Sequence, residues 1–141
     1  MSAALSIHPE TLTELLHVRA GELESATFVR NAEIEWSYRD FARRVSEVAA
    51  GLQAVGVEPG DVVAVILPNC PEYLEAWWGV LWAGGVFNPV NPVFTGREAS
   101  QILADSGASV VICRSETAEA LDRHRGELTA LRHVITLAPS R

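Results

Sequence analysis

The chain has 141 residues, about the length of one domain, of which 48% are hydrophobic and 21% are charged. This composition is typical of a globular protein with a sizeable core and argues against disorder. The formal net charge of -7 argues against nucleic acid or an anionic membrane as a partner, because phosphates attract a basic face. All 11 Lys and Arg residues are arginines, so chemistry that needs a lysine amine is excluded within this chain.

The start of the chain, MSAALSIHPETL, lacks a basic stretch followed by a long apolar one, so no signal peptide is predicted. The longest apolar run, residues 76–87, is shorter than the roughly 20 residues that a membrane-spanning helix needs. We therefore expect no transmembrane segment. These features favour a soluble protein in a reducing, cytoplasmic setting.

The first predicted element is a short amphipathic helix within the opening twenty-odd residues. Its apolar positions are Leu12, Leu15, Leu16 and Val18. Residues 26–37 then predict two short strands joined at residues 30–32, which is the pattern of a β-hairpin.

A longer helix is predicted after the hairpin. Ser37 and Asp40 have the spacing of a capping box, so the helix should begin just after Ser37. The apolar residues recur at steps of three and four: Phe41, Val45, Val48, Leu52 and Val55. Gly56 is expected to end the helix as a left-handed cap.

The rest of the chain alternates between short apolar runs and helical segments. The predicted strands are residues 61–68, 86–90, 108–113 and 133–137. The predicted helices are residues 71–83, 97–107 and 115–128. This order predicts an α/β fold: a layered, mostly parallel sheet with flanking helices, preceded by the N-terminal β-hairpin.

The stretch NPVNPVFTGRE, residues 88–98, connects a strand to a helix. The residue before a proline avoids the α region, so Asn88 and Asn91 should be extended or in turns. Thr95 and Glu98 form a second capping box. We interpret the stretch as a structural connection. If it contacted a substrate instead, Asn88 and Asn91 would supply the polar side chains for that contact.

Cysteines and carboxylates offer weak catalytic signals. Cys70 and Cys113 form no Cys-x-x-Cys pair, which argues against zinc and redox motifs. Cys113 ends an apolar run and is interpreted as a core residue, whereas Cys70 lies in the loop PNCP, where a catalytic thiol is the less favoured reading. Glu72 and Glu75 are expected on an exposed helix start rather than as an acid–base pair.

Histidines and aromatic residues allow two readings. The histidines at positions 8, 17, 124 and 133 have no metal-ligand spacing, and the cluster at 122–125 is interpreted as a solvated helix end. The tryptophans at 77, 78 and 82 could line a ligand pocket, but helical spacing within an apolar stretch favours the core.

Motifs for known chemistry are missing from the sequence. No Gly-x-Gly-x-x-Gly follows the first long strand and no Gly-x-Ser-x-Gly occurs, which disfavours a dinucleotide-binding site and an α/β-hydrolase. From the residues alone, no catalytic, cofactor-binding or metal-ligating residue is assigned.

The order of segments resembles the N-terminal portion of an acyl-CoA synthetase, in the adenylate-forming, AMP-binding superfamily. The resemblance spans residues 24–136 and is carried best by GLQAVGVEPGDVVAVILPN and AGGVFNPVNPVFTGREASQILADSGASVVI. Asn91–Pro92 stands where peptide-synthetase adenylation domains usually have Asp-Pro, so the carboxylic acid ligases are the nearer branch.

The resemblance implies residues 1–23 as a helical lead-in and residues 24–141 as part of the large N-terminal domain, ending before the phosphate loop. It implies an intact enzyme of fatty acid metabolism that uses ATP, Mg²⁺ and CoA and activates a carboxylic acid as an acyl-adenylate. The phosphate loop, the substrate pockets and the adenylation lysine of the family lie outside the matching region. No family site residue can therefore be placed on this chain, and none of the cofactors is expected to bind it alone.

Two hypotheses follow for function. The first is a segment of an ATP-dependent carboxylic acid–CoA ligase that is inactive without the remainder of the synthetase chain. The second is a truncated, non-catalytic remnant or protein-interaction module of the same fold. A small nucleotide binder is a third reading, because parallel sheets often bind ligands at their strand ends. Under the first hypothesis we expect the reading frame to continue into a Ser/Thr/Gly-rich stretch that carries a lysine.

Overall fold

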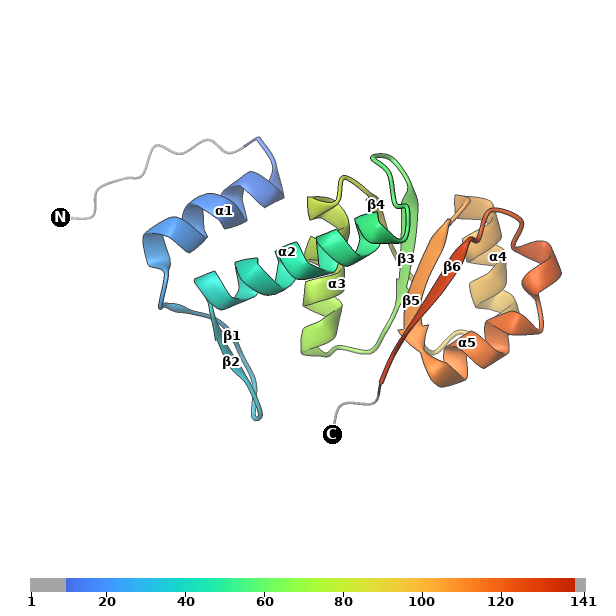
Figure 1. The fold of residues 1–141 in the computed structure, drawn as a ribbon. Helices are drawn as coiled ribbons and strands as arrows, with labels where there is room; N and C mark the ends of the chain where they lie inside the picture. The colour runs from blue at the N-terminus through green and yellow to red at the C-terminus, as the bar shows by residue number, and fades with distance from the viewer. Residues whose placement is uncertain (1–9, 139–141) are drawn as a thin grey trace. The chain divides into compact units, whose positions relative to one another are not determined.

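The computed structural model describes residues 10–138, which form an α/β fold (Figure 1). The elements are α1 (Leu12–Leu23), β1 (Thr27–Arg30), β2 (Glu35–Ser37), α2 (Tyr38–Ala54), β3 (Val62–Ile66), α3 (Pro71–Trp82), β4 (Val86–Pro89), α4 (Gly96–Ser106), β5 (Val110–Arg114), α5 (Ser115–Asp122), the 3-10 helix η1 (Arg125–Glu127) and β6 (His133–Leu137). They divide into two compact units, one up to Arg44 and one from Val45 onward.

The first unit is organised by aromatic packing around an antiparallel hairpin of β1 and β2. Phe28 of β1 lies 4.7 Å, between ring centroids, from both Tyr38 and Phe41 at the start of α2. The guanidinium of Arg44 lies 4.3 Å from the ring centroid of Trp36, in cation–π geometry. The predicted hairpin and opening helix are confirmed.

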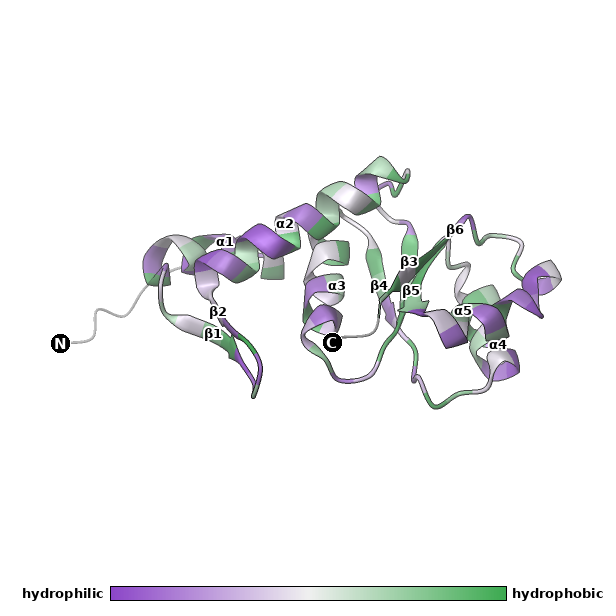
Figure 2. Ribbon diagram, turned by 60° about the horizontal axis from the view of Figure 1, so that its bottom comes forward, coloured by the Kyte–Doolittle hydropathy of each residue, from purple (hydrophilic) through white to green (hydrophobic). Residues whose placement is uncertain are grey.

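The second unit contains a four-stranded parallel sheet in the order β4-β3-β5-β6. Its strands are drawn largely in the hydrophobic colour of Figure 2. The central strands β3 and β5 are buried on both faces, as expected for a parallel sheet covered by helices. Val63, Val65 and Ile112 point to one face, where they pack with helices α2 and α3. Alternate residues of the same strands, such as Ala64 and Val111, point to the other face, towards α4 and α5. The mostly parallel, layered sheet is therefore confirmed.

The capping residues predicted at the helix ends are confirmed. The Thr95 hydroxyl accepts from the backbone N–H of Glu98, whose carboxylate accepts from the backbone N–H of Thr95 at 2.8 Å, so the capping box is complete. Asp40 N–H donates to the Ser37 hydroxyl at 3.1 Å at the start of α2. Gly56 has φ 86°, the left-handed conformation that the sequence predicts after this helix.

The last helix is shorter than predicted. A helix over residues 115–128 was expected, but α5 ends at Asp122 and a 3-10 turn follows. The turn lets Leu128 and Leu131 enter the core, where they are 4% and 6% exposed. Arg125 stabilises this path by donating to the Leu131 carbonyl at 2.9 Å. Burial of two leucines therefore outweighs continuation of a polar helix.

Candidate functional site

The carboxyl ends of the parallel strands form the candidate site. In the order β4-β3-β5-β6, the connection from β3 leads to one side and the connection from β4 crosses to the other, so the order reverses between β3 and β5. Ligands of open α/β sheets bind outside the carboxyl ends of the strands at such a point. Any binding chemistry of this sheet is therefore expected at the ends of β3 and β5.

Three polar side chains meet there: Cys70, Glu72 and Arg114. Arg114 ends β5, and its Nη2 lies 4.0 Å from both the Glu72 Oε1 and the Cys70 Sγ. Its Nη1 donates to the carbonyl of Ala138, just after β6. Cys70 is the N-cap residue of α3, with Pro71 in the first turn as predicted. The guanidinium therefore connects the carboxyl ends of three neighbouring strands, β3, β5 and β6.

Electrostatics keep the Cys70 thiol protonated. Burial, followed by the hydrogen bond with Glu72, raises the pKa of Cys70 above its usual 9.0, and these effects outweigh the opposing hydrogen bond from the Tyr73 backbone and the charge of Arg114. The thiolate is the nucleophilic form of cysteine, so Cys70 is a poor nucleophile near neutral pH. Cys113 is buried, which raises its pKa to about 11. Neither residue has the environment of a catalytic thiol.

This edge of the sheet does not fit an ATP triphosphate. Phosphate sites offer glycine-rich backbone amides and cationic side chains. The segment after β3 reads PNCPEY and has no glycine. Arg114 is already engaged by Glu72 and the Ala138 carbonyl, and the Glu72 carboxylate would repel a phosphate. The residues that the structure describes here serve to connect elements.

The asparagines of the β4–α4 connection are engaged in local structure. The Asn88 side chain donates to the Ser106 hydroxyl of α4 at 3.0 Å. The Asn91 side chain accepts from the backbone N–H of Val93 at 3.0 Å, which forms a turn ahead of α4. Both contacts support the structural interpretation of the NPVNP stretch.

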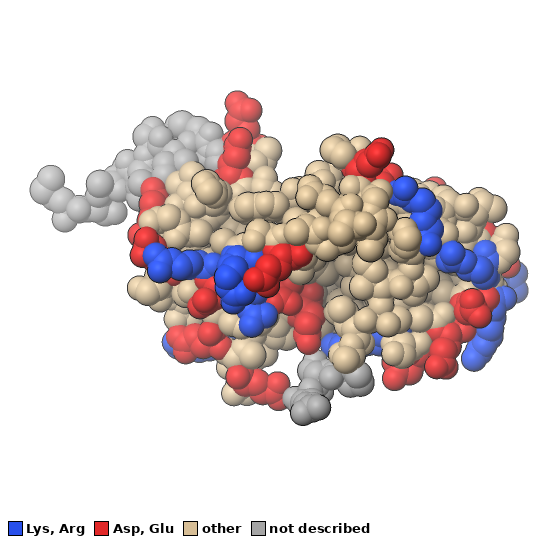
Figure 3. All heavy atoms as spheres, in the orientation of Figure 1, with Lys and Arg blue, Asp and Glu red and all other residues tan. Residues whose placement is uncertain are grey.

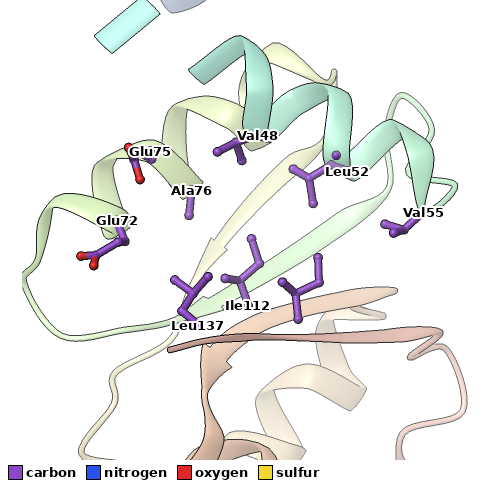
Figure 4. A pocket seen from close by; sticks show the side chains of 10 residues that line it. Val48, Leu52, Val55, Glu72, Glu75, Ala76, Ile112 and Leu137 are labelled. Atoms are coloured by element: carbon purple, nitrogen blue, oxygen red, sulfur yellow. The ribbon is translucent and has the colours of Figure 1, made fainter. Parts of the chain in front are cut away.

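An apolar groove lies between helices α2 and α3 and the sheet, with a volume of about 390 Å³. In Figure 4, Val48 and Leu52 of α2, with Val55 just after this helix, lie opposite Ile112 of β5 and Leu137 of β6. Glu72 and Glu75 line the groove from α3. Both side chains are half-buried, so the expectation that they lie on an exposed helix start is wrong: they border an apolar surface.

The tryptophans of α3 are partly buried instead of fully in the core. The Trp77 ring stacks on Phe87 of β4 at 5.7 Å between centroids, and Trp82 packs against the core beneath α3. Trp78 lies beside Trp77, with 6.2 Å between the ring centroids. Trp82 packs directly against the core, and Trp77 contacts it through Phe87, so both agree with the core interpretation, although all three rings are only half-buried.

The histidines provide no metal site in the part of the chain that the structure describes. There, no group of three or more His, Cys, Asp or Glu residues could hold a metal ion. The Nδ1 of His124 lies 3.5 Å from the Glu127 carboxylate, His133 is exposed on β6, and His8 lies outside the described residues.

None of the helices within residues 10–138 is long and apolar enough to cross a membrane.

Sequence reasoning missed the meeting of Arg114 with Cys70 and Glu72. The signal was available, because Arg114 directly follows the apolar run ASVVIC and Cys70 follows the run DVVAVIL. The carboxyl ends of parallel strands lie at the same edge of a sheet, so residues that follow two neighbouring strands come together. The strand order was the missing information.

Comparison with known proteins gives the family. The family model described as AMP-binding enzyme matches residues 16–140. A feruloyl-CoA synthase of Amycolatopsis sp. is 46% identical over 101 residues, covering 72% of this chain and 21% of the relative. A long-chain-fatty-acid–CoA ligase of Bacillus subtilis is 34% identical over 108 residues, covering 77% of this chain and 19% of the relative.

Solved structures agree with this assignment. A fatty acyl CoA synthetase of Mycobacterium tuberculosis superposes with a TM-score of 0.82 at 26% identity, covering 89% of this chain and 26% of that protein. ATP-bound MatB of Rhodopseudomonas palustris gives a TM-score of 0.80 at 26% identity, covering 91% of this chain and 25% of that protein.

The chain belongs to the AMP-binding enzyme family and corresponds to an N-terminal portion of an adenylate-forming enzyme. It spans about a fifth of the length of the curated relatives it matches. Among the branches of the family, acyl-CoA ligases supply these relatives, so the resemblance noted in the sequence is confirmed.

Proposed function

We propose that this chain is the N-terminal segment of an ATP-dependent carboxylic acid–CoA ligase and has no catalytic activity by itself. The intact enzyme would activate the acid as an acyl-adenylate, with release of pyrophosphate, and then transfer the acyl group to the CoA thiol. ATP, Mg²⁺ and CoA would be its cofactors. The CoA-ligase names of the relatives support this assignment.

One observation carries the proposal of inactivity: the strand ends are occupied by internal contacts. Arg114 is held by Glu72 and the Ala138 carbonyl, and Asn88 is held by Ser106. Adenylation requires groups that stabilise negative charge on the phosphates as pyrophosphate leaves. A segment whose polar groups fix its own loops would contribute a scaffold for chemistry performed by other parts of the enzyme.

A joined chain tests the ligase assignment. This chain would replace the matching segment of the Amycolatopsis feruloyl-CoA synthase, and thioester formation would be followed with ATP, CoA and ferulate. We expect the joined chain to form the thioester, because the segment supplies the same scaffold. A matched joined chain with Gly79→Trp, which should disrupt packing of α3 on α2, is the inactive control. A folded joined chain without activity would favour a non-catalytic module of the same fold.

A further inference from the structure

Arg114 occupies a position where the local structure favours a different residue. It is the last residue of β5 and the N-cap of α5, but its side chain makes no capping hydrogen bond. Short polar side chains such as serine and aspartate are preferred at an N-cap, because they accept from the first N–H groups of the helix. Cys70, the N-cap of α3, likewise makes no capping hydrogen bond through its side chain. The helix starts that follow β5 and β3 therefore lack the side chains that would stabilise them locally.

The side chain of Arg114 is also mostly buried. It is 18% exposed, whereas the side chains of Arg30 and Arg39, which also form ion pairs, are 65% and 66% exposed. Figure 3 shows charged side chains gathered at the surface over α5 and η1, the elements that follow Arg114. Replacing a buried ion pair by packed apolar residues is often neutral for stability or increases it. Stability alone therefore does not account for an arginine at this position.

The contacts of Arg114 lead to the point where the chain leaves β6. Arg114 pairs with Leu137 in the register of β5 and β6, and its Nη1 donates to the carbonyl of the next residue, Ala138. Its Nη2 lies 4.0 Å from the Oε1 of Glu72, in the first turn of α3. The guanidinium is planar, so its two terminal nitrogens hold these partners at a fixed angle to each other. The end of β6 is therefore oriented relative to the start of α3.

We propose that Arg114 is a positioning residue of the ligase: it fixes the direction in which the chain leaves β6 and thereby places the following segment for adenylation. This inference rests on the proposed function, in which the chain continues from Ala138 into the remainder of the synthetase. Under that function, the groups that stabilise the leaving pyrophosphate belong to the remainder. A misplacement of about 1 Å can slow an enzyme reaction about a hundredfold. Loss of Arg114 should therefore slow adenylation more than it weakens binding of the acid.

Three variants of the joined chain described above test this role by exchange of pyrophosphate into ATP with ferulate. Arg114→Ser removes the guanidinium and supplies a capping hydroxyl to α5, so it should preserve stability. Arg114→Lys keeps the positive charge but loses the planar pair of donors. Arg132→Gln is the matched control, because Arg132 contacts Asp61 at 2.5 Å and so connects the opposite, amino ends of β6 and β3. Urea unfolding of the same variants of the 141-residue chain measures their stability.

We expect Arg114→Ser to lower the maximal exchange rate by about tenfold or more and to change the KM for ferulate by less than about twofold. Arg114→Lys should recover part of the rate, and Arg132→Gln should change both quantities by less than about twofold. The urea midpoint of Arg114→Ser should stay near that of the unmodified chain. An unchanged rate, a change confined to KM, or equal rate losses for Arg114→Ser and Arg132→Gln would overturn the proposal. So would a rate loss that follows a loss of stability.

Amide hydrogen exchange separates failure of this inference from failure of the proposed function. In the joined chain, Arg114→Ser should increase amide exchange at the end of β6 and in the segment that follows, and Arg132→Gln should not. An active joined chain in which Arg114→Ser changes neither the rate nor the amide exchange would leave the function intact and remove Arg114 as a positioning residue. A joined chain that is inactive with Arg114 present, but in which Arg114→Ser still loosens that segment, would retain the positioning contact and contradict the ligase assignment.

Discussion

Gly79 of α3 lies against Val48 of α2 so closely that a methyl group added at Gly79 would come within 2.7 Å of the Val48 Cβ. Gly79 is buried and Val48 borders the apolar groove. The distance between these two helices therefore depends on the absence of a side chain at position 79. Since both helices cover the same face of the sheet, this contact also sets the width of the groove.

Gly79→Ala should lower the free energy of unfolding. Overpacking typically destabilises a core by about 1–3 kcal/mol, whereas replacing glycine by alanine inside a helix stabilises it by about 1 kcal/mol. We therefore expect a net loss of about 1 kcal/mol. Urea unfolding measures this difference. Val48→Ala in the same chain should recover part of the loss.

Gly51→Ala is the matched control for that experiment. Gly51 lies in α2 and an added methyl group would meet nothing within 4 Å, so the change should stabilise the chain by about 0.5–1 kcal/mol. If Gly79→Ala is as stabilising as Gly51→Ala, the close packing of the two helices is contradicted.

The capping box of α4 should contribute measurably to stability. Thr95→Ala removes the hydroxyl that accepts from the Glu98 N–H, and we expect a loss of about 1 kcal/mol in urea unfolding at pH 7. Thr129→Ala, at an exposed loop position, is the control and should change stability little. A loss of equal size in both variants would mean that the cap is not formed in solution.

Glu98 gives the same cap a dependence on pH. Hydrogen bonds from the Thr95 backbone N–H, and next from its hydroxyl, hold the pKa of Glu98 below its usual 4.5. A carboxyl whose pKa is lower in the folded state than in the unfolded state stabilises the fold at pH values above its unfolded-state pKa. This contribution is lost as the pH falls through the folded-state pKa. The unmodified chain should therefore exceed Glu98→Ala in stability at pH 7, with a difference that shrinks below about pH 4.5. A difference that grows in acid would contradict this sign.

The fold could be predicted from sequence because its signals are local. Ser37 with Asp40 and Thr95 with Glu98 place two helix starts, and the apolar runs give the parallel strands. The contact of Arg114 with Glu72 could not be predicted, because it depends on which strands are neighbours. The end of α5 was also missed, because burial of Leu128 and Leu131 is a tertiary effect that the helical pattern does not contain.

The two cysteines should react with iodoacetamide at very different rates. At pH 8, Cys70 should react slowly and Cys113 not at all in the folded chain, because both thiols are protonated and Cys113 is fully buried. The rate at Cys70 should rise as the pH increases beyond 9.0. Mass spectrometry of the unmodified chain and of Cys70→Ser separates the two sites. Rapid modification of Cys70 at pH 7 would contradict the protonated thiol.

Burial of the Cys113 thiol also predicts a loss of stability in base. Its pKa rises from 9.0 to about 11 in the folded chain. The resulting contribution to the free energy of unfolding is therefore fully present below pH 9 and is lost as the pH approaches 11. Urea unfolding of the unmodified chain and of Cys113→Ala measures this effect. The stability difference between them should fall over that range, and a rising difference would contradict the burial.

The most direct test of the central claim is acid-dependent exchange of pyrophosphate into ATP, measured with a panel of fatty and aryl acids that includes ferulate. Exchange reports formation of the acyl-adenylate before CoA takes part. We predict background exchange for the pure 141-residue chain and ferulate-dependent exchange for the chain joined to the rest of the Amycolatopsis feruloyl-CoA synthase. Reproducible acid-dependent exchange by the pure chain alone would contradict its assignment as a non-catalytic segment of the ligase.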